Sequence, residues 1–487
     1  YCIENDDIKI VIEKMKKYIY ISKIIALTLF SGMILYSCKP QSKKVTSLDT
    51  NKNPDKSTIQ MVSNVKHPEW SKNLSIYEVN LRQYTKSGTF RDFEEHLPRL
   101  KKLGVGILWL MPIHPIGEKN RKGSLGSYYS IKDYYGVNPE FGTIEDFKHL
   151  VTKIHDLGMY VIIDWVANHT AWDNLMIREH PEWYTVDIDG NFRSPVDDWS
   201  DVVDLNFNNN KLQSYMMDAM KFWVQTTDID GFRCDVAGMV PTEFWDKVRV
   251  QLDSFKLVFL LAEWEDPLLH ENAFDMTYAW EIHRTFNKLA KGEQYLQSLD
   301  VIIENDQKDY PENTYRMLFT TNHDENTWNG TAIDRFGDGL DVFTVLTYTL
   351  PGMPLIYSGQ EAGLSKQLAF FDKDDILWQQ HPAADQYREL NQLKYNNPAL
   401  WNGEFGGAYT RVINSMDNVV LSFFRKKDKD TILVMANLSP NPVNFNMKLF
   451  FPNGEFTDID SGEKVTFNKI DQFQLPPWGY RIFEYLD

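Results

Sequence analysis

From about residue 66 onward, short apolar runs alternate with longer segments of helical periodicity, and this alternation limits the folds open to the chain. The first apolar runs are LSIYEVNL, GILWLMPI and YVIIDWV, and between them lie TFRDFEEHLPRLKKLGV and TIEDFKHLVTKIHDLGM. Threonine before an acidic first turn and Leu-Gly at the end are expected helix caps. Strands that alternate with helices in this way form a parallel sheet, so the chain is predicted to be an α/β protein.

Five further apolar runs follow: IDGFRCD, KLVFLLAEW, AFDMTY, MLFTTNHD and GMPLIYSGQ. Eight strand candidates over about 330 residues fit a closed (β/α)₈ TIM barrel better than an open doubly wound sheet. No glycine-rich phosphate-binding loop follows the first run, which also argues against the open sheet. We therefore expect a barrel over residues 66–400, with its ligand chemistry at the C-terminal ends of the strands.

Two other regions depart from this rhythm. The longest irregular insertion, at about 170–208, follows the third strand, and its VDIDGNF stretch reads either as a hairpin turn at Asp-Gly or as a calcium loop. The hairpin is favoured because the spaced acidic ligands of a calcium loop are missing. Residues 401–487 lose helical periodicity and predict a C-terminal antiparallel β-sandwich.

The N-terminal part has the pattern of a secretory leader. From Met15, MKKYIYISKIIALTLFSGMILYSCKP places basic residues before an apolar stretch and small residues before Cys38. This ending resembles a bacterial lipoprotein signal over residues 1–38, and it predicts an exported protein held on a bacterial membrane, periplasmic or at the cell surface, by a lipid on Cys38. The alternative is a single membrane-spanning anchor, although the apolar stretch is short for one. Residues 1–14 are acidic where a leader should be basic, so we interpret them as untranslated.

Residues 39–65 are polar and predict a flexible tether. Of the three cysteines only Cys234 lies in the folded body, so a disulfide framework is excluded. A net charge of −17 argues against nucleic acid or an anionic lipid surface as partners, which leaves the lipid anchor as the one expected membrane contact. Aromatic residues make up 14% of the chain, enough for some to stack on neutral sugar rings, while most must pack the core.

Charged and polar residues appear where several apolar runs end. Arg233 and Asp235 lie two positions apart, so in a strand they share a face, and the guanidinium keeps the carboxylate ionised. Such a pair by itself is most often a structural ion pair. Other strand ends carry similar groups: Asp164, Asn168, His169, Glu263, Asn322, His323 and Asp324. Several acids at one rim need a metal or a positively charged sugar transition state.

At these residues the chain resembles the α-amylase family, glycoside hydrolase family 13, across residues 66–487. DWVANH, GFRCD, AEW and TTNHD occur in the order of the family's four best-known segments, and VDLN, GMPLIYSGQE and PWGYRIFE agree as well. The resemblance implies that Asp235 is the nucleophile and Glu263 the general acid and base. It implies that Asp324 holds the substrate hydroxyls in the transition state.

The same resemblance assigns substrate-binding roles. Arg233 would orient Asp235, His169 and His323 would bond the sugar at the cleavage subsite, and Tyr129 would stack on it. Asp164 is usually structural in the family. The chemistry requires no cofactor, and Asn168 is where many relatives bind a structural calcium ion. The residues agree with these roles: Arg233 keeps Asp235 charged, and the apolar VFLLA before Glu263 should raise its pKa. A metal centre is a weaker interpretation, because no metal-ligand spacing of histidines occurs.

We therefore expect a retaining hydrolase that cleaves α-1,4 and also α-1,6 bonds in starch, maltodextrins or related α-glucans. The alternatives are a transglycosylase or isomerase of the same family and a non-catalytic glycan-binding lipoprotein. Gly238 and Met239 stand where many α-amylases have Lys and His on the leaving-group side. Either they leave an open, apolar subsite that accepts short, branched or cyclic glucans, or they only pack the start of the next helix.

Overall fold

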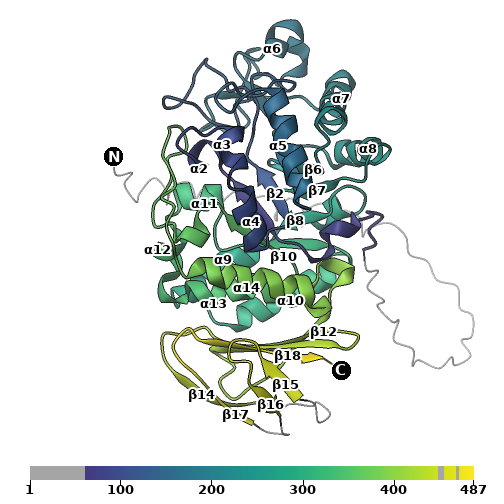
Figure 1. Cartoon of the computed structure of the whole chain (residues 1–487). Helices are drawn as coiled ribbons and strands as arrows, with labels where there is room; N and C mark the ends of the chain where they lie inside the picture. Colours follow the sequence, from purple (N-terminus) through teal and green to yellow (C-terminus); the bar gives the residue numbers. More distant parts are fainter. Residues whose placement is uncertain (1–60, 448–454, 468–470, 487) are drawn as a thin grey trace, which may run out of the picture. The chain divides into compact units, whose positions relative to one another are not determined.

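The structure is a computed structural model that describes residues 61–447, 455–467 and 471–486. Eight parallel strands close into a barrel in which neighbours follow the order β1, β2, β3, β6, β7, β8, β9 and β10 (Figure 1). Their bounds are Ile76–Val79, Ile107–Leu110, Tyr160–Trp165, Gly231–Cys234, Phe259–Ala262, Met276–Tyr278, Tyr315–Leu318 and Met353–Tyr357. Seven of the predicted apolar runs contain one of these strands, and the run MLFTTNHD overlaps the end of β9, so the predicted TIM barrel is confirmed.

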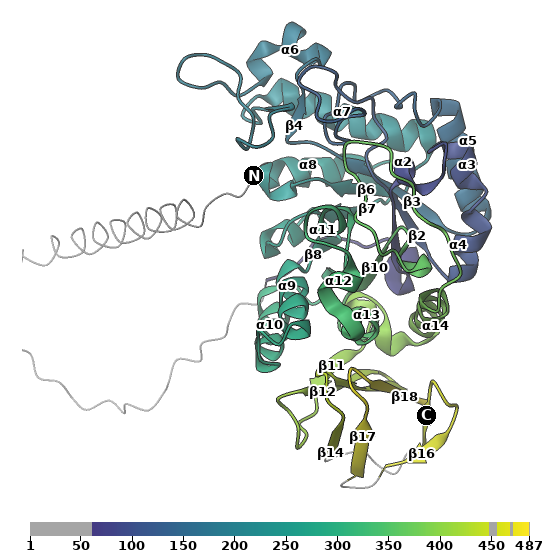
Figure 2. The same ribbon diagram turned by 90° about the vertical axis from the view of Figure 1, so that its left-hand side faces the viewer.

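Helices lie around the barrel and cover its outer face (Figures 1 and 2). The helices of the barrel domain are α2 Leu81–Tyr84, α3 Phe90–Glu94, α4 Leu97–Leu103, α5 Ile144–Asp156, α7 Asn210–Thr227, α8 Thr242–Asp253, α9 Trp280–Ala290, α10 Gln297–Asp309, α11 His323–Trp328, α12 Ala332–Phe336, α13 Leu340–Thr349 and α14 Ala383–Asn396. Short 3₁₀ helices also occur: η1 Glu69–Asn73, η2 Pro181–Trp183, η3 Ala237–Met239, η4 Pro267–His270, η5 Gly337–Gly339, η6 Gln360–Ala362, η7 Pro398–Leu400 and η8 Gly403–Phe405.

The predicted threonine caps are present. Thr143 and Asp146 form a reciprocal capping box at the start of α5, and Thr89 accepts a hydrogen bond from the backbone of Asp92 at the start of α3. The first predicted helix is divided into α3 and α4, and Pro98 stands in the first turn of α4. A proline lacks an N–H and is tolerated only in a first turn, so the helix restarts there.

Two long segments follow strands β2 and β3 at the C-terminal end of the barrel. The insertion after β3 contains β4 His169–Ala171, α6 Leu175–Glu179 and β5 Val202–Asp204. Within it Val186 pairs with Phe192, and the Asp187 N–H donates to the Asn191 carbonyl at 2.9 Å. The hairpin turn predicted for this stretch is therefore confirmed.

The C-terminal strands are β11 Ala408–Arg411, β12 Val420–Lys427, β13 Asp430–Asn437, β14 Val443–Met447, β15 Glu455–Asp458, β16 Lys464–Thr466, β17 Asp471–Leu475 and β18 Tyr480–Leu486. They form a six-stranded antiparallel sheet, β11-β12-β13-β18-β15-β16, and a two-stranded sheet, β14-β17 (Figure 2). Side chains of both sheets, among them Leu433, Phe445 and Phe473, share one apolar core. The predicted antiparallel C-terminal domain is confirmed.

The leader, the lipid site at Cys38 and most of the predicted tether lie outside the described residues. The end of the tether is ordered against the barrel, because the Asn64 N–H donates to the Glu271 carbonyl at 2.7 Å. Within residues 61–447, 455–467 and 471–486, none of the helices combines the length and apolar character needed to span a bilayer.

Candidate active site

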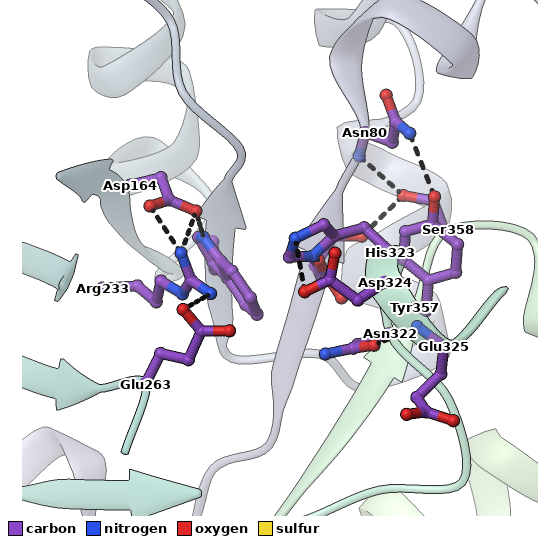
Figure 3. Close-up of polar contacts among 12 residues, drawn as sticks. Asn80, Asp164, Arg233, Glu263, Asn322, His323, Asp324, Glu325, Tyr357 and Ser358 are labelled. Atoms are coloured by element: carbon purple, nitrogen blue, oxygen red, sulfur yellow. Dashed lines mark hydrogen bonds and ion pairs between the residues drawn. The ribbon is translucent and has the colours of Figure 1, made fainter. Parts of the chain in front are cut away.

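The predicted site residues come together at the C-terminal end of the barrel, and Figure 3 shows Asp164, Arg233, Glu263, His323 and Asp324 among them. Strand pairing places Asp164 of β3 beside Arg233 of β6, and β7 follows β6 in the sheet. A cleft of about 540 Å³ opens above these strand ends. Its walls include six of the seven residues predicted for catalysis or sugar binding: Tyr129, His169, Asp235, Glu263, His323 and Asp324. The seventh, Arg233, is fully buried beneath them.

Arg233 joins three carboxyl groups. Its Nη1 donates to Asp164 Oδ1 at 2.9 Å and to Asp235 Oδ1 at 3.0 Å. Its Nη2 lies 2.9 Å from Glu263 Oε2 in an ion pair that is not aligned as a hydrogen bond. Asp164 also accepts from the Trp109 indole at 3.2 Å, which fits the structural role expected for it. One guanidinium therefore fixes the positions of Asp235 and Glu263 relative to each other.

The two candidate catalytic carboxyl groups differ in their affinity for a proton. Burial raises the pKa of Asp235 to about 6, while Arg233 opposes the rise. Burial raises the pKa of Glu263 to about 8, and the nearby Asp235 and Asp324 charges add to the rise against the opposing effect of Arg233. Near neutral pH the site thus holds an ionised Asp235 beside a protonated Glu263.

His323 is the second cationic group of the site. Its Nδ1 lies 2.5 Å from Glu78 Oε1, and its Nε2 lies 2.8 Å from the Tyr129 hydroxyl and 3.3 Å from Asp324 Oδ2. The Tyr129 O–H itself donates to Asp164 at 3.1 Å, so His323 Nε2 must donate to Tyr129. Burial by itself would lower the pKa of His323, but Asp324 and Glu78 outweigh it and raise the pKa to about 9.

Glu78 was not predicted from the sequence. It lies in β1, is fully buried, and holds the ring of His323 from below the cleft. The signal that could have found it is a glutamate in the otherwise apolar run LSIYEVNL, because a carboxylate in a buried strand needs a partner.

His169, at the start of β4, also lines the cleft. Burial lowers its pKa to about 4, so the imidazole is neutral and can both donate and accept. The adjacent Asn168 contacts it, with Nδ2 3.4 Å from His169 Nδ1. Among the residues that the structure describes, no three His, Cys, Asp or Glu side chains are grouped to hold a metal ion. The acidic ligands that calcium favours are thus not gathered around Asn168, and calcium binding there stays a prediction.

Gly238 and Met239 lie in η3, directly after Asp235. A Cβ atom at Gly238 would fall 2.1 Å from the indole of Trp264, so Trp264 fills the space beside this glycine. Gly238 itself therefore leaves no open space, and the open, apolar subsite stays a prediction that rests on Met239. Met239 and Trp264 themselves are partly exposed, 37% and 38%, and present an apolar surface next to Glu263.

A cleft at the C-terminal end of a parallel barrel, with an ionised carboxylate beside a carboxylic acid of raised pKa, defines a glycoside hydrolase of the paired-carboxylate type. Residues 76–412 match the α-amylase catalytic domain, and residues 410–482 match the C-terminal domain of maltogenic amylase. The chain belongs to the α-amylase family.

Similar proteins agree with this membership. The structure of a maltogenic α-amylase, AmyB, from Thermotoga neapolitana is 32% identical over 86% of this chain and all of its own, with a TM-score of 0.79. The α-amylase MalA of Haloarcula japonica is 26% identical over 81% of this chain, which spans 59% of MalA's length. The α-1,4-glucan:maltose-1-phosphate maltosyltransferase of Picrophilus torridus is 26% identical over 82% of this chain and 67% of its own.

Proposed function

We propose that the protein is a retaining α-glucan hydrolase that cleaves α-1,4 and α-1,6 glucosidic bonds. The observation that carries the proposal is the position of Arg233 between Asp235 and Glu263. Both carboxyl groups contact one guanidinium, which favours the short separation of retaining enzymes, about 5 to 5.5 Å, over the wider spacing of inverting ones.

In the first step the Asp235 carboxylate attacks the anomeric carbon while Glu263 gives its proton to the departing glycosidic oxygen. The bond from that carbon to the leaving sugar breaks, and a covalent glycosyl ester with Asp235 forms. In the second step the Glu263 carboxylate takes a proton from water, whose oxygen attacks the same carbon and releases Asp235. Two inversions at one carbon retain the α configuration.

The remaining site residues would hold the sugar that is attacked. Tyr129 provides an aromatic ring in the cleft, and cationic His323 and neutral His169 provide donors for its hydroxyls. Asp324 is the least buried of the three acids, with 36% of its side chain exposed. It is therefore free to accept from two sugar hydroxyls as the ring flattens in the transition state.

The alternative is transfer of the glycosyl group to a second sugar instead of water. The exposed apolar surface of Met239 and Trp264 beside Glu263 favours this alternative, because an aromatic face binds an incoming sugar ring. The similarity to a maltosyltransferase also supports it. A non-catalytic glycan-binding protein is less favoured, since Asp235, Glu263 and Asp324 all line the cleft.

Incubation with starch, pullulan, cyclodextrin, maltotriose and trehalose, followed by chromatography of the products, tests the proposal. We expect shorter α-glucans from at least one of the first four substrates. Products longer than the substrate would show transfer, and a rearranged disaccharide would show isomerisation. An Asp235→Asn variant is the control, and no turnover of any α-glucan by the unmodified protein would contradict the proposal.

We also propose that the protein is exported and anchored by a lipid on Cys38. The leader that ends in Leu-Tyr-Ser-Cys supports this location.

A further inference from the structure

One segment of the loop after β2 crosses from one wall of the cleft to the other. We name this segment, residues 117–126, the strap. On one side it is fixed to the loop after β10. The N–H and hydroxyl of Ser124 donate to Asp372 Oδ1 at 2.9 and 2.5 Å, and the Leu125 N–H donates to the Phe371 carbonyl at 2.9 Å.

The contact with the loop after β10 is also close-packed. Gly123 has a positive φ of 62°, and a Cβ atom there would lie 2.4 Å from the Cβ of Phe371. Glycine is needed at this position because it tolerates a positive φ and because it lets the backbone of the strap pack against Phe371. The strap is therefore held against this wall by hydrogen bonds and by shape.

On the other side the strap reaches the insertion after β3 through Lys122. Its Nζ donates to the Asp198 carbonyl at 2.6 Å and lies 3.4 Å from Asp201 Oδ1. Asp201 is buried, and its own carbonyl accepts from the Ser130 hydroxyl at 3.0 Å. The Lys122 ammonium also lies 5.9 Å from the ring of Phe371. Lys122 thus ties together the strap, the insertion and the loop after β10.

The roles of the cleft residues show which end of the cleft the strap crosses. Glu263 protonates the departing oxygen, so the leaving sugar lies on the side of Glu263 and Val236. The sugar that is attacked lies against Tyr129 and His323. Any further sugars on its non-reducing side continue toward the part of the cleft wall where Lys122 lies between Asp198 and Asp201 of the insertion and Phe371 of the loop after β10. The strap crosses at that end.

We propose that the strap closes the donor end of the cleft and that Lys122 determines the mode of attack: the enzyme takes the free non-reducing end of an α-glucan and releases a short product from it. This inference rests on the proposed function. The cleft of about 540 Å³ has room for a ligand of about two or three sugar rings. A longer donor chain would have to pass through the position of the ammonium and its carbonyl and carboxylate partners.

Closure of the donor end should also exclude cyclic substrates. A cyclodextrin has no free non-reducing end, so it cannot place a chain end in a cleft that is closed at its donor end. Branches and varied groups on the leaving side are unaffected, because the exposed apolar side chains near Glu263 are Met239 and Trp264, which do not belong to the strap.

The test uses maltoheptaose with a 4-nitrophenyl group at its reducing end, either free or blocked by an ethylidene group at its non-reducing end. We expect the wild type to cleave the free substrate at least about 100-fold faster than the blocked one. In Lys122→Ala this preference should fall at least about tenfold. Lys119→Ala is the matched control, because Lys119 is an exposed strap lysine that lies over Trp172 and is absent from the cleft lining, and it should keep the wild-type preference.

Comparable rates for the two substrates in the wild type would overturn the inference and leave the proposed hydrolysis intact. An unchanged preference in Lys122→Ala, with an unchanged melting temperature, would overturn the role of Lys122. Failure of the proposed function would appear differently, as no turnover of either heptasaccharide by the wild type, and it would overturn both proposals.

Discussion

Replacement of Glu263 by glutamine removes the proton donor while it keeps the size of the side chain and an oxygen that can accept from the Val236 N–H, which is 2.8 Å from Glu263 Oε2. General acid catalysis contributes about 10²- to 10⁴-fold, so kcat/KM for maltotriose should fall by that amount. Fluoride leaves without protonation, so kcat/KM for α-maltosyl fluoride should fall by about tenfold or less. This ratio covers only the steps up to departure of the leaving group.

The pH dependence gives a second, independent measure. Asp235 must be ionised and has a pKa of about 6, whereas Glu263 must be protonated and has a pKa of about 8. Activity of the wild type should therefore rise through about pH 6, peak near pH 7 and fall through about pH 8. In Glu263→Gln the acid limb should remain and the alkaline limb should disappear.

The assay is kcat/KM for both substrates between pH 5 and 9, for the wild type and the variant. Equal losses for maltotriose and the fluoride would show that Glu263 does not protonate the leaving group. An alkaline limb that persists near pH 8 in the variant would assign that proton to another residue. Either result would refute the reasoning from burial and from the carboxyl groups around Arg233.

Four further outcomes are expected. Asp235→Asn should lower turnover of maltotriose and α-maltosyl fluoride by several powers of ten. Proton NMR of the wild-type reaction should show the α-anomer as the first product, and a β-anomer would contradict the assignment of Asp235 as nucleophile. The pKa of His323 is raised to about 9, so the contribution of its charge to stability is complete below about pH 6.5 and is lost as the pH rises through 9. Glu78→Gln should therefore flatten this part of the curve of melting temperature against pH. An unchanged curve would count against the pairing of Glu78 with His323. Gly238→Ala places a Cβ atom 2.1 Å from the indole ring of Trp264 and should destabilise the fold by about 1–3 kcal/mol. The melting temperature should then fall by a few degrees. An unchanged melting temperature would show that the ring moves freely. Cys38→Ser should move the exported protein from the membrane to the soluble fraction, and an unchanged membrane fraction would favour an uncleaved apolar anchor.

The barrel could be predicted because its strands are buried on both faces, so each one appears in the sequence as a short, nearly continuous apolar run. The acids could be predicted for a related reason. Residues such as Asp164 and Glu263 end apolar runs, and all parallel strands of a barrel end at one rim. Their positions thus follow from chain order alone.

The contacts that set the chemistry could not be predicted in this way. Glu78 and His323 are 245 positions apart, and Lys122 reaches Asp198 from an irregular loop without periodicity. Two interpretations of Gly238 stayed open because the ring that fills its space, Trp264, belongs to a different strand end. In each case the partner belongs to a different strand or βα loop, and its position depends on packing and not on local pattern.

The number of counterions in the site decides which carboxyl group keeps its proton. Asp164 and Asp235 already share Nη1 of Arg233, and Glu78 and Asp324 already surround His323. A charge on Glu263 would have to share Arg233 with Asp164 and Asp235 and would lie in an environment with little water. Glu263 therefore holds its proton at neutral pH because the cations beside it are already shared. The acid of the proposed mechanism is selected by the whole buried cluster, of which the apolar residues around Glu263 are only one part.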